Sequence, residues 1–491
     1  MKYIFFLMLF TGFVLRFYNF DARLEFLGDQ GRDGMIIYEA WKEKELPLLG
    51  PPVSTGGYLG PFYYYLIAPF YILSNFNPVI PAYAIAAFDI MAIALLFIIL
   101  HRRFGYYVSV PAAALYATSP AVVSSTAQLW NPAAVPFFVL TLAYAVHRYT
   151  EDKNNIWIAL MGFVIGIMVQ LHYSALFYLS AVPAFLAVYG YRTKAKKKLA
   201  LIIRQLLFFI VAFLIPLIPF ILYELTHEFS NTQSLIAIFI SLGKSGPAIQ
   251  RAGILDASSA IGFLLLPVQN KFITAIVPFV IIILLAAKRN ALNIIIAAWL
   301  TSGIILLATL HDPIPKHYTL FLLPVPFIAF AAGMASILHQ NRNRLYAGIL
   351  AAVLVLLNVL RSDAFGDTHT DLARTDSLVK AMIHEAAGEP FSFTVFNSRS
   401  FSDLHYRFFF TREGISPVSI EDDNYPLLFV ACEHGCPPDE EMKGWGGMQA
   451  LCFDPVCFRE YPRINLTDRH FKGSLKIENS RLFIFSAVPD S

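Results

Sequence analysis

The sequence has few charged residues. Asp, Glu, Lys and Arg make up 14% of its 491 residues, whereas an ordinary soluble domain carries about 25%. Cysteine is absent from the first 431 residues, so no disulfide can constrain that part of the chain. An excess of one sign of charge is also lacking, because the formal net charge is only +3. These absences exclude a typical soluble protein and give no reason to expect a nucleic-acid partner.

Long apolar runs are frequent instead. Most approach the ~20 residues that cross ~30 Å of hydrocarbon. The first run is followed by no small-residue cleavage site, so we expect a retained helix rather than a signal peptide. The composition predicts an all-α polytopic membrane domain of about eleven transmembrane helices. The predicted spans are 3–18, 78–100, 107–124, 133–147, 156–171, 174–190, 199–222, 272–287, 291–310, 318–337 and 345–360.

The connections between these runs are of two alternating kinds. One kind is short and basic, and such loops mark the cytoplasmic side. The other kind is longer, aromatic or mixed in charge. This alternation predicts a cytoplasmic N-terminus, an external first loop at 19–77 and a further external loop at 223–271. The basic connections are His101–Arg103, Arg148 with Lys153, 192–198, Lys288 with Arg289, and Arg342 with Arg344.

The segment from Pro61 to Phe76 decides this orientation. It is apolar but short and rich in Tyr, and Tyr is typical of the headgroup level of a membrane. If it crossed the bilayer, every later basic loop would change sides. We therefore predict that it lies flat on the outer leaflet.

The tail is predicted to be a small extracytoplasmic α/β domain at 361–491, after a transmembrane domain at 1–360. The runs 391–396, 427–431 and 482–487 are typical of strands, and 371–387 is typical of an amphipathic helix. Four clustered cysteines on the oxidising side of a membrane favour disulfides. A zinc site is the alternative, and the pairing is not readable from sequence. These cysteines are Cys432, Cys436, Cys452 and Cys457.

An acidic stretch follows the first apolar run directly. In a helix Asp29, Arg32 and Asp33 would lie near one face. The carboxylate of Asp29 suits proton transfer from an attacking hydroxyl, and Arg32 suits the binding of a phosphate. The same pattern is also typical of a helix start stabilised by a structural salt bridge.

Further polar residues lie at the ends of predicted spans on the same external side. Ionisable groups in such places are costly unless they are paired or hydrated, which makes them candidates for function. Each has a structural alternative, but together they favour an outward-facing active site. They are His172, Tyr173, Tyr223, Glu224, His227, Glu228, His311, Asp312, Lys316, His317 and Tyr318.

The order of these motifs resembles the GT-C membrane glycosyltransferases, in the branch of protein O-mannosyltransferases and aminoarabinose transferases. The resemblance covers about residues 1–360. An acidic loop that commonly reads Asp-Glu-Ala-Arg is matched by 29–32, and a Pro-aromatic segment by 60–65. A late Arg-Tyr before apolar residues and prolines is matched by His317 and Tyr318.

The resemblance implies inverting transfer of a sugar from a polyprenyl-phosphate carrier to an acceptor on the outer face. Asp29 would be the general base, with Asp33 as a second acid, and Arg32 would bind the donor phosphate. Gly60 replaces the family's Lys, so Lys316, His317 or Tyr318 is expected to contact that phosphate. No cofactor is expected, and a divalent metal is the less favoured alternative, because Gln30 replaces an acid that would help to hold it. The residues expected to contact substrate are Gln30, Tyr63, Asn131, His172, Tyr173 and Glu224.

Two other functions stay open. A flippase or transporter for lipid-linked glycans would need internal repeats and charges within its spans, and Asp89 is the main such charge. A glycan polymerase or ligase would need a central external loop rich in Arg, whereas 223–271 holds one Arg. The expected partners are membrane lipid, the polyprenyl-phosphate sugar donor and an acceptor of unknown kind. The expected location is the plasma or inner membrane.

Overall fold

A computed structural model describes most of the chain. Several predicted features lie outside its described residues: most of the span 174–190, the basic residues 192–197 and 288–289, His311 and Asp312, and Cys452 and Cys457. The described residues are 2–53, 56–179, 198–243, 251–287, 291–310, 313–337, 341–366, 368, 370–422, 425–449, 451 and 463–487.

The chain divides into two compact units. The first consists of Met1–Asn19, Leu48–Ile67 and Ala82–Asp367, and the second of Phe20–Pro47, Ala68–Pro81 and Thr368–Ser491. The division differs from the predicted boundary at 360, because most of the first external loop groups with the C-terminal tail rather than with the apolar helices.

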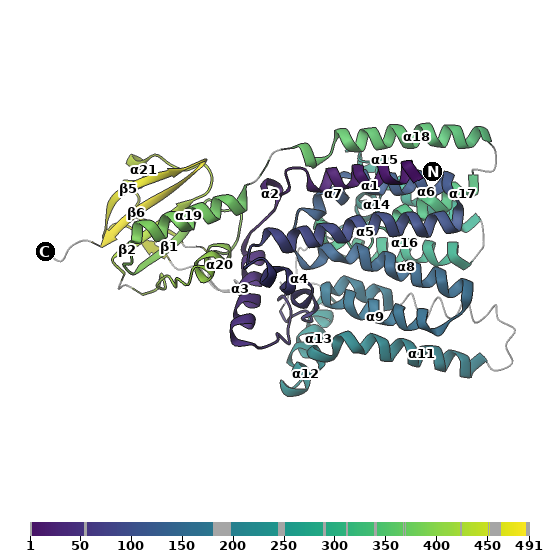
Figure 1. Ribbon diagram of the computed structural model, residues 1–491, viewed down its shortest axis with the longest axis horizontal. Coiled ribbons are helices and arrows are strands. Elements are labelled where there is room, and N and C mark those ends of the chain that lie inside the picture. The colour runs from purple at the N-terminus through teal and green to yellow at the C-terminus, as the bar shows by residue number, and fades with distance from the viewer. Residues whose placement is uncertain are drawn as a thin grey trace. The chain divides into compact units, whose positions relative to one another are not determined.

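The regular elements in the described part of the first unit are all helices (Figure 1). Helices α4 (Phe62–Leu73) and α5 (Val79–Phe104) have residues in both units. The others are α1 (Lys2–Phe17), α6 (Tyr106–Thr118), α7 (Pro120–Thr126), η1 (Asn131–Ala134), α8 (Val135–Asp152), α9 (Asn155–Leu171), η2 (Tyr173–Phe177), α11 (Lys198–Leu214), η3 (Ile215–Leu217), α12 (Ile218–Thr226), α13 (Ser230–Gly243), α14 (Ile254–Leu265), α15 (Lys271–Ala287), α16 (Ala291–Ala308), η4 (Lys316–Thr319), α17 (Val325–Ile337), α18 (Asn341–Leu360) and η5 (Asp363–Phe365).

Neighbouring helices of the first unit pack closely where glycine removes a side chain. A Cβ atom on Gly162 or Gly166 of α9 would overlap the carbonyl oxygen of Phe209 or Phe213 in α11. A Cβ atom on Gly262 of α14 would likewise overlap Thr274 of α15. Small residues that let backbones approach are typical of helix packing inside a membrane.

Three described helical stretches are long and apolar enough to cross a membrane. They are Val79–Phe104, Leu199–Thr226 and Leu345–Phe365. Other apolar helices of the described chain are shorter, such as Asn155–Leu171 and Lys271–Ala287. The number of eleven spans therefore stays a prediction.

The structure adds helices and breaks that sequence analysis did not separate. The predicted run 199–222 is interrupted by η3 at Pro216, and 107–124 divides into α6 and α7 before Pro120, because proline cannot continue the hydrogen bonding of a helix. The predicted loop 223–271 contains α13 and α14. These apolar helices were missed because each is too short to span a bilayer.

The second unit has a small mixed sheet. Its strands are ordered β1-β2-β6-β5, with β1 and β2 parallel and the other pairs antiparallel. A register shift interrupts β5 between Phe471 and Gly473. Its elements are α2 (Phe20–Arg23), α3 (Gly28–Glu43), α19 (Asp371–Ala386), β1 (Phe391–Phe396), α20 (Leu404–Arg412), β2 (Leu427–Cys432), α21 (Asp439–Lys443), β3 (Gly447–Gln449), β4 (Arg463–Asn465), β5 (Arg469–Ile477) and β6 (Ser480–Ala487).

The predicted elements of the tail are confirmed. Strands β1, β2 and β6 contain the three predicted runs, and α19 begins at the predicted Asp371. All six residues of β2 are buried, as expected for a central strand covered on both faces. Helix α20 forms the crossover that two parallel strands require.

Candidate active site

Asp29, Arg32 and Asp33 lie together near the start of α3. Arg32 Nη1 is 2.7 Å from Asp29 Oδ1, and its Nη2 is 2.8 Å from Asp33 Oδ1. The Asp33 side chain is 2% exposed and that of Arg32 is 7% exposed, whereas that of Asp29 is 25% exposed. Of the two acids, Asp29 is therefore the one open to a substrate.

The hydrogen bonds of Arg32 hold Asp33 and one oxygen of Asp29. Arg32 Nε also donates to Asp33 Oδ1 at 3.0 Å, so the guanidinium is held between two carboxylates. Asp29 uses only Oδ1 for Arg32, and its Oδ2 has no hydrogen-bond partner in the described part of the chain. The free carboxylate oxygen at a helix start is available for proton transfer.

Gln30 has a structural contact. Its Oε1 accepts a hydrogen bond of 2.9 Å from the backbone N–H of Leu27, and the residue is buried. This contact satisfies an amide that would otherwise lack a partner at the start of α3. The prediction that Gln30 contacts substrate has no support from this position.

The first unit holds a separate cluster of aromatic and imidazole rings. The ring of His317 lies 4.7 Å from that of Trp130, 4.5 Å from Tyr318 and 5.8 Å from His172. Lys316, directly before His317, is exposed. The cluster joins three connections of the first unit and combines stacking surfaces with a cation.

His172 is neutral at physiological pH. Burial, with a smaller contribution from the charge of His317, lowers the pKa of His172 to about 3. Its Nδ1 lies 2.7 Å from Ser174 Oγ. His172 thus offers a neutral, hydrogen-bonding ring to this cluster.

Glu224 and Tyr173 hold a loop of the first unit. The Glu224 carboxylate is buried and accepts backbone hydrogen bonds from Asn231 and Thr232. Asn231 Oδ1 accepts from the backbone N–H of Tyr58 at 2.6 Å, and its Nδ2 donates to the Tyr58 carbonyl at 2.7 Å. Tyr173 OH donates to the same carbonyl at 2.5 Å. The side chains of both predicted substrate ligands are therefore used within the protein.

Two other predicted substrate residues are buried. Asn131 Nδ2 donates to the carbonyl of Leu171 at 2.5 Å. Tyr63 is fully buried, with its ring 6.1 Å from that of Tyr64. Neither side chain is open to a ligand in this structure.

Sequence analysis missed Gln170. Its Nε2 donates to the carbonyl of Pro216 at 2.8 Å, where proline interrupts α11 and α12, and its Oε1 accepts from Phe62 N–H. A Cβ atom on Gly60 would overlap the Gln170 side chain. A lone amide at the end of an otherwise apolar helix was the available signal.

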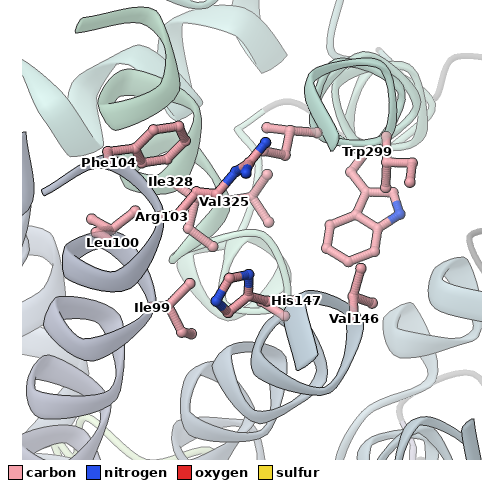
Figure 2. Close-up of a pocket in the computed structure, with 12 residues that line it drawn as sticks. Ile99, Leu100, Arg103, Phe104, Val146, His147, Trp299, Val325 and Ile328 are labelled. Carbon is pink, nitrogen blue, oxygen red and sulfur yellow. The ribbon is translucent and has the colours of Figure 1, made fainter. Parts of the chain in front are cut away.

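The pocket in Figure 2 is of a different kind. Its twelve lining residues are apolar except for Arg103, His147 and the indole N–H of Trp299, and none is acidic. His147 lies twelve residues into α8, about 18 Å along the helix from its start. The pocket therefore contains none of the acidic residues that sequence analysis assigned to the reaction.

The second unit also contains a buried charge network. Arg374 Nη2 lies 2.7 Å from Asp371 and 3.4 Å from Glu433. His405 Nε2 lies 3.2 Å from Glu433 Oε1, and Tyr406 OH donates to the same oxygen at 3.1 Å. Burial acts to raise the pKa of Glu433, but the hydrogen bond and charge of His405, together with Arg374, outweigh it and lower the pKa to about 2.

Replacement of Glu433 is expected to remove pH-dependent stability. A carboxylate whose pKa falls on folding stabilises fully above its unfolded pKa, near 4.5, and loses this effect as pH falls towards 2. Glu433→Gln should cost about 3 kcal/mol at neutral pH. Thermal unfolding of the full chain in detergent, compared at pH 7, 4 and 3, should show the difference from wild type shrinking. If the difference in stability between Glu433→Gln and wild type did not change with pH, the lowered pKa of Glu433 would not be its cause.

Cys432 and Cys436 form a disulfide. It joins the end of β2 to the residues that follow. Among the residues that the structure covers, no group of three or more His, Cys, Asp or Glu side chains is placed to hold a metal ion.

This combination of helical bundle, acidic helix and small mixed-sheet unit is the fold of the GT-C membrane glycosyltransferases. ArnT from Cupriavidus metallidurans bound to undecaprenyl phosphate matches with a TM-score of 0.61 and 13% identity, covering 99% of this chain and 98% of that one. An oligosaccharyltransferase from Archaeoglobus fulgidus, in complex with zinc and sulfate, matches with a TM-score of 0.53 and 11% identity, covering 87% of this chain and 67% of that one. AglB from Archaeoglobus fulgidus, in complex with an inhibitory peptide and a dolichol-phosphate, matches with a TM-score of 0.51 and 10% identity, covering 87% of this chain and 69% of that one.

Within this class, residues 59–223 match the family described as dolichyl-phosphate-mannose-protein mannosyltransferase. No curated protein matches the sequence. The predicted resemblance to the GT-C membrane glycosyltransferases is confirmed by this family match and by the shared fold.

Proposed function

We propose that this protein transfers a sugar from a polyprenyl-phosphate donor to an acceptor at the outer face of the membrane. The observation that carries the proposal is Asp29, a partly exposed carboxylate oriented by Arg32 at the start of α3. Two proteins with this fold are bound to a lipid phosphate, undecaprenyl phosphate in one and a dolichol-phosphate in the other, and this supports the donor class.

In the proposed reaction Asp29 Oδ2 takes the proton of an acceptor hydroxyl as its oxygen attacks the anomeric carbon. The bond from that carbon to the donor phosphate breaks, and polyprenyl phosphate leaves with the bonding electrons. A single displacement inverts the anomeric centre. Asp33 is assigned to holding Arg32, because it is buried.

Arg32 would have to release a carboxylate in order to bind the donor phosphate. Two carboxylates already occupy its guanidinium, so we assign it chiefly to orienting Asp29. Lys316 is exposed beside the aromatic cluster and is our first candidate for the phosphate. Tyr318 and neutral His172 would supply hydrogen bonds.

Lys316→Ala should raise the KM for the donor about tenfold, because a charge-assisted phosphate contact is lost. Lys316→Arg should keep most of the affinity. Lys153→Ala, which removes an exposed lysine after α8, is the control and should leave KM unchanged. Steady-state kinetics with varied donor measures the effect, and an unaltered KM in Lys316→Ala would exclude this role.

We also propose that the N-terminus is cytoplasmic and that the C-terminal domain is extracytoplasmic. The basic connections support this orientation. In sealed cells an impermeant thiol reagent should label Lys316→Cys above the level of the unsubstituted chain, and Arg102→Cys only after permeabilisation. The reverse pattern would invert the topology.

The reaction itself is tested with purified protein and a panel of lipid-phosphate sugars. Mass spectrometry should detect released lipid phosphate and a glycosylated acceptor. In vesicles, a flippase would move the donor between leaflets without consuming it. Donor movement without consumption would therefore favour that alternative.

A further inference from the structure

The helix that carries Asp29 packs through a face of glycines. Gly28, Gly31 and Gly34 recur every third residue and so lie on one face of α3. This face meets the segment Ser400–Phe408, which leads into and forms the first half of α20. Both segments belong to the second unit, so this packing lies within one compact body.

The approach is too close for any side chain on these three residues. A Cβ atom on Gly31 would overlap the backbone of Leu404 and His405, and one on Gly28 would overlap Ser402 Oγ. A Cβ atom on Gly34 would lie 2.6 Å from the Phe408 ring. The contact at Gly31 is with backbone, so no side-chain rotation there can relieve a substitution.

Ser400 binds the first turn of α3 directly. The backbone N–H of Gly28 donates to Ser400 Oγ at 3.0 Å, and Ser400 Oγ donates to the carbonyl of Ser402 at 2.7 Å. The first amides of a helix have no partner within the helix and need one from elsewhere. Here the tail of the chain supplies it, one residue before Asp29.

Helix α20 is itself anchored in the sheet part of the unit. His405 and Tyr406 both bind the buried carboxylate of Glu433, which follows β2. The backbone of His405 is also the surface that Gly31 meets. A continuous set of contacts thus joins the end of β2 to the turn that carries Asp29 and Arg32.

We propose that the C-terminal domain is a positioning element of the active site, and that its residues 400–408 fix the location of Asp29. The proposal rests on the proposed function of Asp29. Gly28, Gly31, Gly34 and Ser400 are then positioning residues, which act on the reaction through Asp29 rather than by touching the substrate.

Gly31→Ala tests this role in the full-length protein. We expect kcat to fall at least tenfold with the donor KM within twofold, because the substitution displaces the base and leaves the Lys316 side chain unchanged. In an Asp29→Asn background the same change should cost little more, since both act on one step. Gly348→Ala is the matched control, because a Cβ atom at that helical glycine meets nothing within 4 Å.

A second pair of variants separates positioning from misfolding. Gly34→Ala should lower kcat through its contact with Phe408, and Gly34→Ala with Phe408→Leu should recover most of it. Normal kcat in both Gly31→Ala and Gly34→Ala would overturn the proposal. The proposal would also be overturned if Gly31→Ala lowered kcat by the same factor in the wild type and in the Asp29→Asn background.

Hydrogen exchange distinguishes this proposal from the proposed function. Amides of α3 should exchange faster in Gly31→Ala than in wild type, whether or not a donor is known. If wild type consumes no lipid-phosphate sugar, the proposed function fails. In that case unchanged hydrogen exchange in α3 would also overturn the proposal that residues 400–408 fix this helix, and faster exchange would support it.

Discussion

Asp29→Asn is expected to reduce turnover by a factor of about 10² to 10⁴, the usual contribution of a positioned general base. The amide keeps the shape of the side chain and can still accept a hydrogen bond from Arg32. It cannot take the proton of an attacking hydroxyl. Initial rates of lipid-phosphate release at saturating donor measure the effect.

Glu39→Gln is the control for this prediction. Glu39 is an exposed carboxylate on the same helix, α3, beyond the buried first turns. Its replacement should leave turnover within twofold of wild type. If Asp29→Asn retains normal turnover while remaining folded, Asp29 is not the base. Loss of turnover in both variants would indicate a general effect on the helix.

Asp89→Asn is expected to destabilise the protein by about 3–5 kcal/mol, because it leaves a buried arginine without its counter-charge. Arg16 is fully buried, and its Nε lies 2.5 Å from Asp89 Oδ2. Arg16 Nη1 also donates to the carbonyl of Ala117 at 2.7 Å, and Tyr116 OH donates to Asp89 Oδ1 at 2.7 Å. The pair therefore connects α1, α5 and α6.

The double variant Arg16→Met with Asp89→Leu should be much less destabilised than Asp89→Asn alone. It removes both charges, so no unpaired ion stays in an apolar environment. Unfolding in mixed detergent micelles measures the free energies. A cost below 1 kcal/mol for Asp89→Asn would show that the ion pair does not hold the helices together.

The sequence indicated the elements whose pattern is local. Strands β1, β2 and β6 were predicted because short apolar runs end at polar turns. The acidic turn at the start of α3 was also recognisable. Which of its two carboxylates is exposed was not, because Asp29 and Asp33 share one helix face and their burial depends on packing.

Contacts between distant parts of the chain account for what sequence analysis missed. Asp89 was visible as an unusual charge, but its partner Arg16 lies 73 residues earlier. Ser400 binds Gly28 across 372 residues. Glu224 was expected to contact a substrate because it lies at the end of a predicted span. Its oxygens instead accept hydrogen bonds from the backbone of residues 231 and 232, which no local sequence pattern shows.

Strand β5 has a consequence for how molecules of this protein meet one another. It is an outer strand of the sheet, and outer strands can recruit a strand from a second molecule. The irregularity after Phe471 interrupts its ladder, and Arg469, Lys472 and Lys476 add positive charge along it. Such an edge is a poor template for intermolecular pairing. This edge of the sheet is therefore protected against pairing with a second copy of the chain.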